Sequence, residues 1–231
     1  KKIFIKICKF LGFEIIDQNN FNSPTLNKEL NEDLSILNKK SIILPLGEVK
    51  ISRKVSSILI ILRMNTDIEI WDQNKRRLFE KPKIEYSKRS VNSLIKSVNF
   101  CQKKYPGLKI KTIIVDDNSN EDNLRIIKKL TENNNIEIIK LDHNKYKSVI
   151  KEQKNNETFS NLASLLQSFE IGKERGEDLI FFVEDDYLHF EPMLEEMISS
   201  YERISSQIEK DIFMCPSDYP YLYMTNEKTN I

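Results

Sequence analysis

The sequence is poor in cysteine, which removes two classes of protein from consideration. Its 231 residues include three cysteines, Cys8, Cys101 and Cys215, which lie far apart and form no CxxC pair. Neither a disulfide framework nor a zinc cluster can be built from this set. The low count favours a reducing, cytoplasmic setting.

Long apolar runs and an excess of one charge are also missing. The longest aliphatic run covers residues 58–62, whereas a helix needs about 20 apolar residues to cross a bilayer. The sequence therefore predicts no membrane-spanning segment. Because 36 basic residues nearly balance 35 acidic ones, net charge gives no reason to expect a nucleic-acid partner.

The first 16 residues mix four lysines with large apolar side chains. Two lysines interrupt the apolar run and no small-residue cleavage site follows, so a signal peptide is not expected. A basic amphipathic segment of this kind either packs on the core of its own chain, which we expect, or lies on the inner face of a membrane. Residues 17–50 are polar and punctuated by Pro and Gly, so we divide the chain into a lead-in, 1–52, and a domain, 53–231.

Within 53–231, strand-like and helix-like patterns alternate. Strands are predicted at SSILIILRM, KIKTIIVDD, IEIIKL, DLIFFVEDD and DIFMC, with amphipathic helices between them. One of these helices has Leu162, Leu165, Leu166 and Phe169 on its apolar face, and Ser119 with Asp122 resembles a capping box that begins another. This order predicts an α/β fold with a mostly parallel sheet and helices on both faces.

Acidic residues follow two of the predicted strands. Asp116 and Asp117 end one, and Glu184, Asp185 and Asp186 end another. Ligands bind at the carboxyl ends of the strands in such sheets, so both clusters should reach one cleft. With no basic residue near them in sequence, their repulsion calls for a cation, and Mg²⁺ or Mn²⁺ bound with a diphosphate suits oxygen ligands. The plainer alternative is that the acids only cap the next helix.

These motifs together resemble a known family. SILIILRMN, TIIVDDNSNED, NLASLL and GEDLIFFVEDDY, in this order and spacing over residues 55–215, look like family 2 glycosyltransferases of the Rossmann-like GT-A fold. The resemblance implies a metal-dependent enzyme, hexosyltransferase-type and inverting. It would transfer a sugar from a nucleoside diphosphate donor, expected to be UDP-linked, to a glycan or lipid-linked acceptor in polysaccharide biosynthesis.

The same resemblance implies roles for single residues. Asp117 would hydrogen-bond the nucleobase and Asp116 would shape the turn, while Asp186 would bind the metal with Glu184 and Asp185 near the ribose. Residues 63–66, including Arg63 and Asn65, would line the nucleotide pocket. The catalytic base of the family is expected beyond residue 231, on a chain truncated at its C-terminus.

Several residues and readings stay open beside this assignment. Asp218 is the nearest downstream candidate for a catalytic carboxylate, although a surface turn with packed aromatic residues is the more expected interpretation. His143, in a segment predicted to be a polar loop, and His189 receive no role, and the basic cluster at 75–77 is interpreted as a solvated face. A nucleotidyltransferase is not favoured, because no glycine for a phosphate-binding loop follows the first strand. A receiver domain is not favoured either, because that strand ends without an acidic pair. An incomplete nucleotide-binding module that serves as a partner surface is the remaining alternative.

Overall fold

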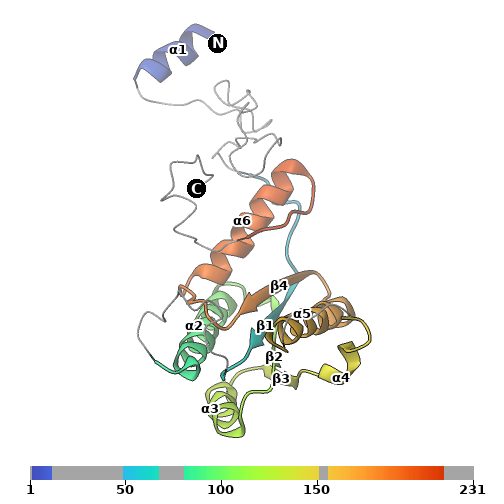
Figure 1. Ribbon diagram of the computed structural model, residues 1–231. Helices are drawn as coiled ribbons and strands as arrows, with labels where there is room; N and C mark the ends of the chain where they lie inside the picture. The colour runs from blue at the N-terminus through green and yellow to red at the C-terminus, as the bar shows by residue number, and fades with distance from the viewer. Residues whose placement is uncertain (1, 12–48, 68–80, 151–155, 216–231) are drawn as a thin grey trace. The chain divides into compact units, whose positions relative to one another are not determined.

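The computed structural model describes residues 2–11, 49–67, 81–150 and 156–215 (Figure 1). The chain divides into two units. The larger comprises Val55–Ile198, and the smaller joins Lys1–Lys54 to Ser199–Ile231. The candidate site lies in the larger unit.

A parallel sheet forms the centre of the larger unit. Its strands are β1 (Ser57–Met64), β2 (Lys109–Asp116), β3 (Ile136–Lys140) and β4 (Leu179–Glu184), arranged in the order β3-β2-β1-β4. All three pairings are parallel. The predicted α/β fold is confirmed, and the architecture agrees with a Rossmann-like GT-A arrangement.

Helices connect the strands and cover both faces of the sheet (Figure 1). They are α2 (Lys83–Lys104), α3 (Glu121–Thr131), α4 (His143–Tyr146) and α5 (Asn156–Arg175). A further helix, α6 (Met193–Ile208), begins in the larger unit and continues into the smaller one. Parallel neighbours require such crossover connections because consecutive strands run in the same direction.

Alternation along β1 divides the core into two layers. Ile58, Ile60, Leu62 and Met64 pack with buried residues of α2, α3 and α6. On the other face, Leu59 and Ile61 pack with residues of β2 and with Ile171 of α5. Since successive side chains of a strand point to opposite faces, a strand buried on both faces must be continuously apolar. That is why SILIIL could be assigned as a central strand from sequence.

Four local predictions differ from the structure. Residues 211–215 form no strand; Asp211 instead accepts hydrogen bonds from Arg53 Nε at 2.9 Å and from the Tyr201 hydroxyl at 2.6 Å. The N-cap of α3 is Asn120, whose side chain accepts from the backbone N–H of Asn123. The segment predicted as a polar loop around His143 contains α4, which is capped by Asp142. The fourth difference concerns the buried face of α5.

The buried face of α5 is not the one that its leucines predicted. Leu162 and Phe169 are exposed at 38% and 48%, whereas Phe159, Ala163 and Ile171 are buried. The small residues Ala163 and Ser168 are both 0% exposed, so they occupy positions where bulk does not fit. Leucine periodicity alone does not show where a small residue is required by close packing.

The N-terminal segment forms the helix α1 (Lys2–Phe10), as its amphipathic pattern indicates. The expectation that it packs on the core of its own chain stays a prediction. Ile3, Phe4, Ile7 and Phe10 are 76%, 64%, 52% and 91% exposed. Most of the expected irregular lead-in, residues 12–48, lies outside the described part of the chain.

Candidate functional site

The two acidic clusters flank the end of β1, as expected. In the sheet β1 pairs with β2 on one side and β4 on the other, with Met64 opposite Asp116 and Arg63 opposite Glu184. Because all three strands are parallel, their carboxyl ends meet at one edge. The segments 63–67, 116–119 and 184–186 at this edge form the candidate site.

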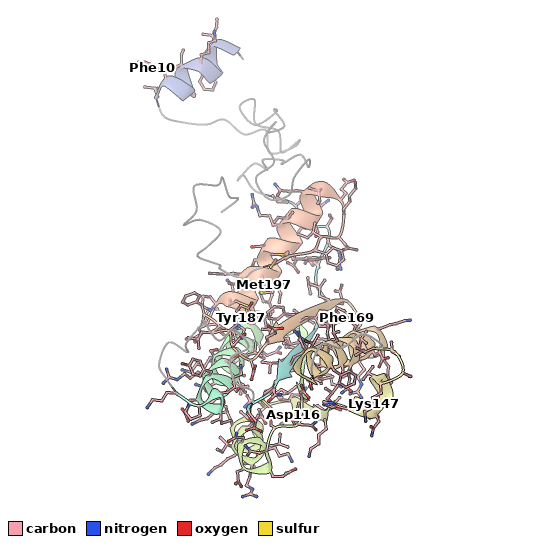
Figure 2. The ribbon with its side chains drawn as sticks, viewed as in Figure 1. Phe10, Asp116, Lys147, Phe169, Tyr187 and Met197 are labelled. Carbon is pink, nitrogen blue, oxygen red and sulfur yellow. The ribbon has the colours of Figure 1, made fainter. Side chains whose placement is uncertain are left out.

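Asp116 is the most deeply buried acid of the site (Figure 2). It is 0% exposed, and among the described residues no group makes a hydrogen bond of good geometry to either carboxylate oxygen, although Ser119 lies close enough to act on its charge. Desolvation raises the pKa of this carboxyl, while the hydroxyl and the backbone N–H of Ser119 oppose the rise. The Asp116 carbonyl accepts from the Leu141 N–H at 2.8 Å.

Asp117 belongs to a small polar cluster with His143, Asn118 and Ser160. Its Oδ1 lies 2.7 Å from His143 Nε2 and accepts from the Ser160 hydroxyl at 3.3 Å. His143 Nε2 also lies 3.0 Å from the side-chain amide nitrogen of Asn118, so one ring nitrogen contacts both residues of the turn. Among the described residues no group donates to Oδ2, so Asp117 retains an acceptor for a ligand.

Sequence reasoning left His143 without a role. It follows the end of β3, the neighbour of β2, so the rule that gathers the acids at the strand ends also brings His143 there. Its ring packs against Phe159, with centroids 5.8 Å apart and a tilt of 54°. The histidine thus connects the β3 end and α5 to Asp117.

The turn after β2 depends on a residue with positive φ. Asn118 has φ of 56°, a conformation that asparagine tolerates better than most residues. The turn allows the Ser119 hydroxyl to accept from the Thr66 N–H at 3.1 Å. Asp67 then accepts from the side chain of Asn123 at 2.8 Å and from Asn120. These contacts tie the loop after β1 to the start of α3, a role for Asp67 that the sequence did not suggest.

Arg63 neutralises Glu184. Its Nη2 donates to Glu184 Oε1, while Nη1 donates to Asn161 Oδ1 at 2.8 Å and to Ser164 Oγ at 3.3 Å. The guanidinium therefore joins β1 and β4 to α5. Asn65, the other predicted pocket residue, accepts from the Asp67 N–H at 3.0 Å and stabilises the turn.

Asp185 is also neutralised by the protein itself. The Lys83 ammonium donates to Asp185 Oδ1 at 2.8 Å, and the Ser87 hydroxyl donates to Oδ2. Both charged side chains are buried, at 12% and 8% exposure. Desolvation raises the pKa of Asp185, with Lys83 and Ser87 opposing the rise. The premise that no basic residue lies near the acidic clusters is therefore wrong. Arg63 and Lys83 are far from these acids in sequence but pair with them in the structure.

Asp186 differs from the two acids before it. It is exposed in the turn after β4 and makes no hydrogen bond or ion pair with the described residues. No group of three or more His, Cys, Asp or Glu side chains in the described ranges is arranged to hold a metal ion. Mg²⁺ does not require one, since it is commonly bound by one or two carboxylates plus substrate phosphates. Asp186 fits that kind of ligand set, together with a diphosphate.

Other predicted residues take no part in the described site. Asp218 and the basic cluster 75–77 lie outside the described residues. His189 is close in sequence to Asp186, but burial lowers its pKa to about 4 and its Nε2 has no partner among the described groups. A cavity of about 180 Å³ lies between α2, β2 and the turn before β3, lined by Leu94, Gln102, Thr112 and Asn134 among others, and none of the acidic residues lines it.

Comparison with solved structures finds a distant structural likeness. No protein-family model matches the chain. No curated protein matches it either. Among solved structures, the chain is similar to the crystal structure of S. aureus TarS 1-349, with 15% identity and a TM-score of 0.35. The match covers 62% of this chain and 31% of that one, and it assigns no activity here.

Within the described ranges, no helix is long and apolar enough to cross a membrane.

Proposed function

We propose that this chain is the nucleotide-binding part of a glycosyltransferase. It would transfer a sugar from a nucleoside diphosphate donor, UDP-linked, to the hydroxyl of a glycan or lipid-linked acceptor. The observation that carries the proposal is the meeting of acidic residues from β2 and β4 on either side of the β1 end. Ligands of open parallel sheets bind at such an edge.

The nucleobase is assigned to Asp117. Its free Oδ2 is an acceptor held in place because Oδ1 is fixed by His143 and Ser160. Uracil presents a ring N–H that pairs well with a carboxylate oxygen. A charge-assisted hydrogen bond of this kind contributes about 1.5–3 kcal/mol.

The diphosphate is assigned to Asp186 together with a divalent cation. Glu184 and Asp185 are already paired with Arg63 and Lys83, so Asp186 is the acid after β4 that remains available. Bound there with phosphate oxygens, Mg²⁺ or Mn²⁺ would neutralise charge on the departing diphosphate. Arg63 and Glu184 pair at the carboxyl edge of the sheet, where they would position the ribose and the turn that carries Asp186.

Calorimetric titration with UDP, GDP, CDP and ADP, each with Mn²⁺ and with chelator, tests the proposal. We expect binding of UDP that requires the metal. Asp186→Ala should remove the metal dependence, and Asp117→Asn should weaken UDP about 10- to 100-fold. Glu196→Ala, which changes an exposed acid of α6, serves as the matched control and should bind UDP like the original chain.

The outcomes separate the two assignments. Metal-dependent UDP binding that survives in Asp186→Ala would refute the metal assignment. Equal binding of all four nucleotides by the original chain and by Asp117→Asn would refute the nucleobase assignment. Binding of none would favour an incomplete module that serves as a partner surface.

A further inference from the structure

The helix α1 presents an apolar face that no described residue covers. Ile3, Phe4, Ile7 and Phe10 are between 52% and 91% exposed, and Leu11, just past the helix end, is 61% exposed. At 100° per residue, positions 3, 4, 7, 10 and 11 fall on one side of a helix. The surface of a soluble protein rarely exposes five large apolar side chains side by side within ten residues.

The opposite side of α1 is basic. The sequence places lysine at positions 2, 6 and 9, which is the spacing of a single helix face, and Lys6 is exposed. The helix KIFIKICKF contains no acidic residue. By contrast, α3, α5 and α6 all contain acidic residues, as is usual for helices that face water.

We propose that α1 binds the surface of an anionic lipid bilayer. Its apolar side chains would enter the boundary between headgroups and acyl chains, and its lysines would lie among the anionic headgroups. Charge decides between this occupant and the alternatives. A second copy of α1 would bring more lysines to an acid-free surface, and a nucleic acid would leave the apolar face in water. The inference is independent of the proposed function.

Co-sedimentation of the full chain with vesicles tests the proposal. We expect binding to phosphatidylcholine vesicles that contain about 30% phosphatidylglycerol, little binding to pure phosphatidylcholine, and weaker binding at high salt. Phe10→Glu should reduce binding about ten-fold or more, because it removes a large apolar group and adds a repelled charge. Lys6→Gln should reduce it about five-fold, as expected for one basic residue near an anionic surface.

Matched controls lie in the larger unit. Ile126→Glu changes an exposed isoleucine of α3, and Lys96→Gln changes an exposed lysine of α2, so both should bind vesicles like the original chain. Absence of vesicle binding, equal binding to neutral and anionic vesicles, or unchanged binding by Phe10→Glu would overturn the proposal. A dimer in light scattering that Phe10→Glu dissociates would also contradict it, because a second copy would then cover α1. A lower thermal midpoint in Phe10→Glu would contradict it as well, because α1 would then pack on its own chain.

Discussion

The ion pair of Lys83 and Asp185 is the most informative place to perturb the larger unit. Its N–O distance is 2.8 Å, and both side chains are nearly inaccessible to water. Lys83→Met keeps most of the apolar stem but leaves Asp185 with only the Ser87 hydroxyl. Removing one partner of a buried pair costs about 3–5 kcal/mol of unfolding free energy. For a unit of this size the thermal midpoint should fall by about 10 °C.

The effect of pH on this variant has a definite sign. Desolvation raises the pKa of Asp185 in the folded state above its value in the unfolded chain. The folded state then binds more protons, so stability is lost as pH rises through the interval between the two pKa values. Loss of Lys83 widens that interval. The penalty of Lys83→Met should therefore be large at pH 7 and small near pH 3, below the ordinary pKa of 3.8, where the carboxyl is mostly protonated in both states.

Urea unfolding followed by circular dichroism at both pH values measures this penalty. In the double variant Lys83→Met with Asp185→Asn, the buried charge is gone, and stability at pH 7 should return to within about 1–2 kcal/mol of the original chain. A cost below about 1 kcal/mol at pH 7, a cost that does not change with pH, or failure of the second substitution to restore stability would refute the reasoning.

Three further outcomes are expected. Gly176→Ala should lower the free energy of unfolding by about 1–3 kcal/mol, because a Cβ there would meet the Gly172 carbonyl at 2.6 Å and Ile180 at 2.8 Å. The control Gly107→Ala, where a Cβ would meet nothing within 4 Å, should be nearly neutral in the same urea titration. Burial lowers the pKa of His189 to about 4, so the unfolded state binds more protons than the folded state below pH 6.5. The free energy of unfolding should therefore decrease by on the order of 3 kcal/mol as the pH is lowered. His189→Leu should flatten that fall in unfolding curves at pH 4.5 and 7. Burial raises the pKa of the Cys101 thiol to about 11, so a thiol reagent should modify it only in denaturant, whereas prompt labelling in the native chain would contradict its burial.

The sequence predicted the parts of the fold that depend on local pattern. A continuous apolar run such as 58–62 can be satisfied only by a strand covered on both faces, and it proved to lie at the centre of the sheet. The rule for parallel sheets then brought the ends of β2 and β4 together without knowledge of any contact. The buried face of α5 could not be found in the same way, because Ala163 and Ser168 reveal their role only once the neighbouring strands are in place.

The meeting of the acidic residues at one edge of the sheet was predictable from the sequence, whereas their ion pairs were not. Positions 116, 117 and 184–186 could be assigned to one edge from the ends of their strands. Their partners could not, because Arg63 and Glu184 lie 121 residues apart and Lys83 and Asp185 lie 102 apart. An acidic cluster in sequence therefore need not be an acidic cluster in space. Pairing of Glu184 and Asp185 and complete burial of Asp116 leave Asp117 and Asp186 as the acids that we propose to bind a ligand.

Chemical-shift mapping by NMR tests most directly whether a nucleotide binds at this edge. UDP with Mg²⁺ should shift backbone amides of residues 63–67, 116–119 and 184–187, while amides beside the cavity at Leu94 and Asn134 stay unchanged. Shifts confined to that cavity, or no shifts at saturating UDP, would contradict the account.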